Sequence, residues 1–334
     1  MPPAIRLASW LYEAGIGENR AALVEDGTII EAAIELPSDV RAGAVLPARL
    51  TEILIPGVRG IVAFNGGEAL IEPLPRGLTE GAAFRVEIVR EPLPERDRPK
   101  LARARATDAE PRAGLALLDR IRRGGVALAP AQLGTDPFES AGWSELLESA
   151  ATGEIPFEGG ALRMSLTPAM TLFDVDGSLP APVLAVAGAR AAGAAIRRFG
   201  IGGSIGIDLP TLADRAGRQA AAAALDAALP KPFERTAVNG FGFLQIVRRR
   251  ERASLPELLQ SYPIAAAARA LLRRGEHVPG SGPRTLHAAP AIIALLERQP
   301  AWIAELGRRT GTAIALQREP GLAISAGHVH ASPL

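Results

Sequence analysis

The chain has 334 residues and a mass of 34.9 kDa, and its net charge at neutral pH is only +1. A hydrophobic fraction of 48% with 22% charged residues excludes a disordered protein, which needs low hydrophobicity and high net charge. Cysteine is absent, and this excludes disulfides, thiolate zinc sites and cysteine nucleophiles. The sequence shows no apolar run of membrane-spanning length and no secretory signal pattern, so we expect a cytoplasmic protein.

The first third of the chain is rich in short β-type runs separated by turn residues. In residues 1–40 two such runs flank Asp26-Gly27, a dipeptide that favours a tight hairpin turn. Residues 41–96 continue with short strands and regularly spaced turns, which indicates a small β-barrel of the oligonucleotide-binding type. We therefore predict an N-terminal hairpin followed by a barrel.

The rest of the chain mixes helical and strand patterns. Residues 97–150 open with a proline-rich charged stretch and are expected to be a linker region. Residues 151–265 alternate apolar runs with alanine-rich stretches, which predicts a layered α/β domain, and residues 266–334 predict a small C-terminal α/β domain. Helices are expected over residues 113–124, 143–151, 185–199, 211–229, 253–275 and 290–310. His328 and His330 are expected to lie in a frayed tail.

Two acidic residues carry the clearest chemical signal. Asp174 and Asp208 each lie at the end of a short apolar run, with one predicted helix between them. This arrangement fits a βαβ unit, whose parallel strands end at the same edge of a sheet. Two carboxylates at one edge can share a divalent cation, and Mg²⁺ accepts them together with water and phosphate oxygens. Asp at a strand end is also a common turn former or helix cap, so a structural role stays open.

Basic residues follow the next apolar strand. Four arginines fall within five positions directly after residues 241–247. Such a cluster either neutralises phosphates beside a metal or forms a solvated strand end with surface salt bridges. Arg248 and Arg250 are our phosphate-binding candidates, and Arg197 and Arg198, at the end of the predicted helix before the strand that carries Asp208, are secondary candidates.

Three segments resemble, in order and spacing, the ribonuclease E/G family of endoribonucleases. They are Gly160–Gly177, Phe199–Leu209 and Gly240–Arg250. Further segments resemble the opening hairpin, the inserted barrel and the closing small domain of that family, at residues 18–27, 41–96 and 284–324. The resemblance therefore covers nearly the full chain.

The resemblance implies a metal-dependent endoribonuclease with DNase I-like and RNase H-like layers that hydrolyses single-stranded RNA in RNA processing, including rRNA processing, or in decay. Asp174 and Asp208 match the family's metal-binding aspartates, with Mg²⁺ as the expected ion and Mn²⁺ as the alternative. Asp176 stands where the family usually has Asn and completes the predicted catalytic set. In the barrel, Phe64 is the candidate for stacking on RNA.

The chain also departs from the family pattern. The cysteine element of the family's zinc link is missing, so no zinc and no zinc-bridged dimer are expected, and the oligomeric state stays open. Residues 97–150 are too short for a full 5′-end sensor domain, which leaves recognition of a 5′-monophosphate in doubt. Two alternatives follow: an RNA-binding factor that keeps the scaffold with weak or no catalysis, and a metal-dependent DNA nuclease or phosphodiesterase.

Overall fold

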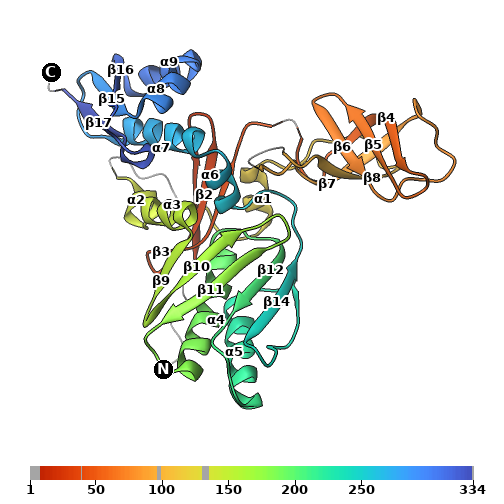
Figure 1. The fold of residues 1–334 in the computed structure, drawn as a ribbon. Helices are drawn as coiled ribbons and strands as arrows, with labels where there is room; N and C mark the ends of the chain where they lie inside the picture. Colours follow the sequence, from red (N-terminus) through yellow and green to blue (C-terminus); the bar gives the residue numbers. More distant parts are fainter. Residues whose placement is uncertain (1–7, 39, 96–98, 130–134, 333–334) are drawn as a thin grey trace.

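The computed structural model describes residues 8–38, 40–95, 99–129 and 135–332, and its ribbon is drawn in Figure 1. Within these residues the strands form a three-stranded N-terminal sheet, a closed barrel, a six-stranded sheet and a three-stranded C-terminal sheet. This combination with helices confirms the expected mixed α/β fold class and the expected barrel. Figure 1 shows the barrel standing to one side, while the C-terminal elements lie at the opposite end.

The N-terminal sheet is an antiparallel meander of three strands. They are β1 (Ser9–Ala14), β2 (Asn19–Glu25) and β3 (Thr28–Glu35). At the turn between β2 and β3, Asp26 has φ 50° and Gly27 has φ 76°. Two successive left-handed residues match the twist of the flanking strands, which is why Asp-Gly is favoured there. The predicted hairpin is therefore confirmed, with β1 added beside it.

The barrel closes in the strand order β4-β5-β6-β8-β7. Its strands are β4 (Val45–Ile55), β5 (Arg59–Phe64), β6 (Gly67–Ile71), β7 (Ala83–Arg90) and β8 (Ala102–Ala106). The expected boundary at residues 41–96 is thus wrong, because β8 pairs with both β6 and β7 and completes the barrel. Ala102 and Ala104 are buried in the barrel core, while the arginine side chains alternate with them. Alanine is a weak strand former, so the amino-acid propensities of residues 102–106 alone predict a linker and not a strand.

The six-stranded sheet has the order β13-β14-β12-β11-β10-β9. Its strands are β9 (Glu154–Phe157), β10 (Gly160–Leu166), β11 (Thr171–Gly177), β12 (Gly203–Asp208), β13 (Glu234–Arg235) and β14 (Phe243–Arg248). Helix α4 (Ala181–Arg198) connects the parallel strands β11 and β12, and α5 (Arg215–Ala228) follows β12. Phe173, Ile207 and Leu244 share one buried core with both helices. The two helices therefore cover one face of the sheet, and in Figure 1 they lie behind the strands.

The remaining helices connect and cap these sheets. They are α1 (Leu117–Arg123), α2 (Pro137–Ser140), α3 (Trp143–Thr152), α6 (Leu255–Ser261), α7 (Pro263–His277), α8 (Pro290–Glu297) and α9 (Pro300–Thr310). The helices expected over 253–275 and 290–310 are each divided in two, at Pro263 and Pro300. A proline lacks the N–H needed inside a helix and suits its first turn, so each one starts a new helix.

The C-terminal sheet has the order β16-β15-β17. Its strands are β15 (Arg284–Ala288), β16 (Ile314–Arg318) and β17 (His328–Ala331), with a short 3₁₀ turn at Ile324–Ala326. The expectation of a frayed tail at His328 and His330 is wrong, because β17 pairs antiparallel with β15. His328 lies opposite His287, and their rings stack with centroids 4.8 Å apart.

A buried cluster of charges joins the N-terminal sheet to α7. Glu18, in the turn between β1 and β2, accepts hydrogen bonds of 2.8 Å from both Arg20 Nη2 and Arg269 Nε. The ring of Trp302 packs against the same turn, because a Cβ at Gly17 would lie 2.6 Å from it. These contacts position the C-terminal elements on the N-terminal sheet. Among the described helices, not one combines the length and the apolar composition that a membrane crossing requires.

Candidate nucleic-acid and metal site

Asp174 and Asp208 lie side by side on the uncovered face of the six-stranded sheet. They are direct partners in the register of the parallel pair β11 and β12. Neighbouring strands are about 4.8 Å apart, and register partners point to the same side of a sheet. Both residues are exposed, whereas Phe173 and Ile207 before them are buried against the helices. The predicted juxtaposition of the two acids is therefore observed.

The two acids belong to a row of side chains that crosses five strands. Successive register pairs join Glu154 to Arg163, Arg163 to Asp174, Asp174 to Asp208, and Asp208 to Phe243. Side chains in such a row share one face of the sheet. The carboxylates thus have a charged flank on the side of β10 and an aromatic flank on the side of β14.

Arg163 is the cation nearest in register to the two acids. Its Nη1 lies 3.2 Å from Asp176 Oδ2, and its Nε lies 3.8 Å from Glu154 Oε1. All three side chains are more than half exposed, and ion pairs in such positions contribute at most about 1 kcal/mol. The guanidinium can therefore leave Asp176 for a phosphate oxygen at little cost. Sequence analysis missed Arg163 because only the register of β10 against β11 places it beside Asp174.

The aromatic flank continues as an apolar floor over Gly206. A Cβ built on Gly206 would lie 2.7 Å from both Leu172 Cδ2 and Phe243 Cζ. The two side chains therefore lean over the bare backbone of this glycine, directly beside the strand ends that carry the acids. A flat apolar surface next to carboxylates suits the face of a nucleobase.

Arg248 does not lie beside the carboxylates, and the expectation of an arginine shelf next to them is wrong for this residue. Along β14 the side chains of Leu244, Ile246 and Arg248 alternate onto the helix-covered face. Its Nη1 donates to the carbonyl of Ile201 at 3.1 Å, and burial lowers the pKa of its guanidinium. Strand β14 ends at Arg248, and beyond it Arg249 pairs with Glu251 and Arg250 with Glu257, so the arginines that adjoin in the sequence have separate partners in space.

Arg197 and Arg198, at the end of α4, also lie on the helix-covered side. Arg197 Nε lies 3.6 Å from Glu31 Oε2, and burial lowers the pKa of Arg198. Both side chains therefore stabilise the packing of α4. They do not lie on the face that carries Asp174 and Asp208, and RNA binding by them stays a prediction.

Arg250 lies at the opposite end of the open face from the acids. It pairs with Glu257 and, together with Lys100 and Ser204, lines a pocket of about 380 Å³ at the beginning of β11 and β12. The length of β12 separates this pocket from Asp208 by about 16 Å at roughly 3.3 Å per residue. Arg250 can therefore contact a phosphate several nucleotides away from the carboxylates, not the one between them.

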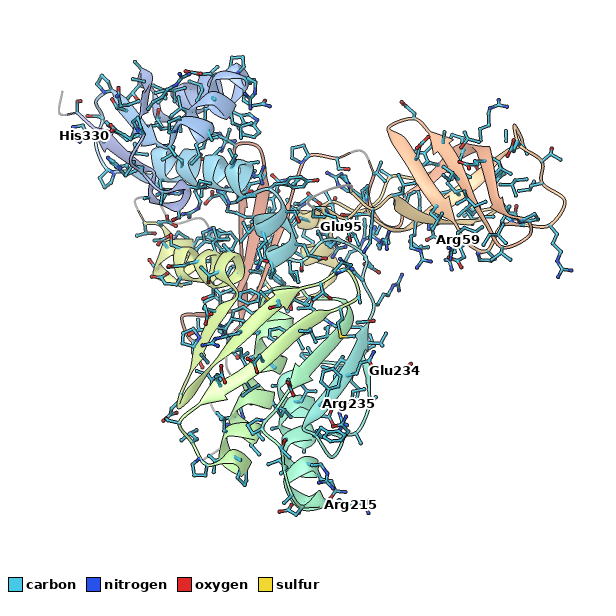
Figure 2. All side chains as sticks on the ribbon, in the orientation of Figure 1. Arg59, Glu95, Arg215, Glu234, Arg235 and His330 are labelled. Atoms are coloured by element: carbon cyan, nitrogen blue, oxygen red, sulfur yellow. The ribbon has the colours of Figure 1, made fainter. Side chains whose placement is uncertain are left out.

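A second set of cations connects this pocket to the barrel. Arg59, Arg90 and Arg103 line an open hollow with Lys100, and Arg59 is labelled on the barrel in Figure 2. Burial and the neighbouring charges of Arg103 and Arg250 lower the pKa of Arg90 to about 10. Glu72 pairs with Arg59 at 3.1 Å and with Arg103 at 2.6 Å, and Glu95 pairs with Lys100 at 2.5 Å, so a phosphate would bind in this hollow in exchange for these carboxylates. Sequence analysis missed it because its members come from four separate segments.

Phe64 is half-buried and packs against the barrel core, and the neighbouring Val62 is fully buried inside it. Strand alternation places Val62 inside, so it has no face for a base. Stacking by Phe64 stays a prediction.

The donor set at Asp174 and Asp208 fits Mg²⁺ when it is tested against the geometry. Among the residues that the structure describes, no group of three or more His, Asp or Glu side chains is arranged to hold a metal ion. Mg²⁺ commonly takes only one or two carboxylates and fills its other positions with water and substrate phosphates. Two adjacent, exposed carboxylates on an open face match that requirement, while Asp176 is engaged by Arg163.

Comparison of the sequence with models of protein families finds no match. Comparison with curated proteins likewise finds no match.

Proposed function

We propose that the protein is a metal-dependent endoribonuclease that hydrolyses phosphodiester bonds of single-stranded RNA. The observation that carries this proposal is the direct register of Asp174 with Asp208 on an uncovered sheet face. An arginine flanks the pair on one side and an apolar floor on the other. Such a reaction needs carboxylates to bind a cation, a guanidinium to bind phosphate and an apolar surface to contact a base.

We further propose that the fold has the layers of the ribonuclease E/G type. In this assignment the six-stranded sheet with α4 and α5 is the DNase I-like layer, and the N-terminal sheet belongs to the RNase H-like layer. The order of the motifs in the sequence and the closed barrel inserted after β3 support it.

The side chains take distinct parts in the proposed reaction. Asp174 and Asp208 would hold Mg²⁺ or Mn²⁺, which when bound lowers the pKa of a water molecule and stabilises charge on the phosphorus centre. Arg163 exchanges its exposed pair with Asp176 for a phosphate oxygen and orients the RNA backbone. The cations around Arg90 and Arg250 then bind phosphates farther along the strand.

The test is a double substitution, Asp174→Asn with Asp208→Asn. Because amides are weak ligands for Mg²⁺, we expect Mg²⁺-dependent cleavage of a labelled single-stranded RNA to be lost. Binding of the same RNA in EDTA, measured by fluorescence anisotropy, is expected to stay within about threefold, since phosphate contacts supply most of the affinity. Asp119→Asn is the matched control, because Asp119 is exposed on α1 and lies 3.9 Å from Arg122.

Cleavage at the wild-type rate by the double variant would overturn the site. Binding of RNA by the wild type without cleavage under Mg²⁺ or Mn²⁺ would favour the RNA-binding factor instead. Equal cleavage of a DNA strand of the same sequence would indicate a less selective phosphodiesterase.

A further inference from the structure

Phe241 is a large aromatic side chain that the fold holds in solvent. It is 83% exposed, more than any other large hydrophobic residue in the described part of the chain. It lies in the turn that precedes β14, whose first residue Phe243 is the register partner of Asp208. The apolar area of this ring is unburied, so it is available to pack against a ligand.

The turn that carries Phe241 is rigidly built. The Asn239 side chain accepts hydrogen bonds from the backbone N–H groups of Phe241 and Phe243, at 2.9 and 3.0 Å. Gly242 has φ +94°, and a Cβ there would lie 2.2 Å from the carbonyl oxygen of Leu209. Only glycine permits this close approach, and the approach ties the turn to the end of β12. The backbone of Phe241 is therefore held in place before any ligand binds.

The turn stands at the carboxyl end of β12, next to the acids. Leu209 N–H donates to the Gly242 carbonyl at 3.2 Å, and the Thr211 hydroxyl donates to the Phe241 carbonyl at 3.4 Å. Two residues span at most about 7 Å, so Phe241 stays within that distance of the residue paired with Asp208. A nucleotide next to a phosphate at the acids is therefore within reach of the ring.

The surroundings of Phe241 select the kind of ligand. Gly240, Asn239 and Thr211 beside it are all exposed, so the immediate neighbours of the ring in the turn offer polar and backbone groups to a ligand. The opposite flank of the acids carries Arg163. An aromatic group on one side of the carboxylates and a guanidinium on the other match the base of one nucleotide and the phosphate of the next.

We propose that Phe241 determines where the RNA is cut, by stacking on the base of the nucleotide adjacent to the scissile phosphate on the side of β14. This inference rests on the proposed endoribonuclease function and adds to it a requirement for an unstacked base at one position. Stacking on an aromatic ring tolerates every base, so it selects for a base being present and free, not for its identity.

The experiment combines an abasic scan of the substrate with variants of Phe241. A single-stranded RNA with one preferred cleavage site is prepared with one base removed at each position in turn. For the wild type we expect removal of one base adjacent to the cut to slow cleavage about tenfold, equivalent to about 1.4 kcal/mol. In Phe241→Ala we expect removal of that base to slow cleavage no more than removal of any other base, because the ring that stacks on it is already missing.

Further variants separate stacking from general hydrophobicity. Phe241→Trp is expected to keep the abasic effect, and Phe241→Leu to lose it although it remains apolar. Ile324→Ala, an exposed residue of the C-terminal 3₁₀ turn, is the control and is expected to behave as the wild type. Because Phe241 is exposed, all its variants are expected to melt at the wild-type temperature.

The outcomes distinguish failure of the inference from failure of the proposed function. If the wild type cleaves RNA but Phe241→Ala keeps the same abasic profile, the stacking role is wrong and the endoribonuclease stands. If the wild type cleaves no RNA, the proposed function is wrong, and anisotropy with the same abasic oligonucleotides in EDTA still tests stacking. Equal affinity of wild type and Phe241→Ala for every oligonucleotide there would overturn the inference as well.

Discussion

The buried carboxylate of Glu18 gives the sharpest prediction about stability. Glu18 is 7% exposed, Arg20 is 1% exposed and Arg269 is 6% exposed. Among the described residues, Arg20 has a second carboxylate partner in Glu13, whereas Glu18 is the one carboxylate paired with Arg269. The substitution Glu18→Gln therefore leaves the Arg269 guanidinium charged, buried and without a counter-ion.

Breaking a buried ion pair on one side costs about 3–5 kcal/mol, because the remaining charge keeps its desolvation penalty. The loss weakens the contact between the β1–β2 turn and α7, and Trp302 of α9 packs on Gly17 in the same turn. Unfolding in urea followed by tryptophan fluorescence is therefore a suitable assay. With roughly 2 kcal/mol per molar urea, the midpoint is expected to fall by about 1.5–2.5 M.

The double variant Glu18→Leu with Arg269→Met removes both charges and fills their space with apolar groups. Such replacements are often neutral or stabilising, so we expect it to recover most of the lost stability. Glu110→Gln, which removes the 83% exposed partner of Arg85, is the control and is expected to leave the midpoint unchanged. A double variant as unstable as Glu18→Gln alone would refute this reasoning.

Three more predictions concern the pH dependence of stability and the turn beside the acids. A hydrogen bond to Glu13 raises the pKa of His277, so the stabilisation by His277 is full below pH 6.5 and is lost as pH rises through the folded-state pKa. Melting curves of wild type and His277→Asn should therefore differ in mild acid and converge in alkali. Burial opposes the charge of Glu13, yet the hydrogen bond from His277 and the charge of Arg20 lower its pKa to about 2. Stability linked to Glu13 is thus present above pH 4.5 and lost toward pH 2, and a Glu13→Gln variant that shows the same acid unfolding as wild type would contradict this. Gly242→Ala forces a left-handed φ on alanine, which alone costs about 1–2 kcal/mol, and we expect a lower melting temperature together with loss of the abasic effect assigned to Phe241; an unchanged abasic profile would show that the turn does not position the ring.

Local rules of the chain were enough to predict several features of this protein. Asp26-Gly27 predicted the hairpin because its turn depends on the two residues themselves. The interval between Asp174 and Asp208 predicted parallel neighbours because one helix of that length returns the chain to the adjacent strand. Prediction of the ion and of the RNA substrate rests on the resemblance and awaits the tests above.

Tertiary structure decided the features that depend on pairing between distant segments. Strand β8 became part of the barrel because its alanines pack inside, although their propensity for strands is low. Arg248 lies on the helix-covered face while Arg163 lies beside the acids, because strand register and alternation determine which face a side chain takes. The exposed ring of Phe241 depends likewise on the approach of Gly242 to Leu209. Sequence order determines which residues share a strand or a turn, but the faces and neighbours of those residues are determined only when the strands pair.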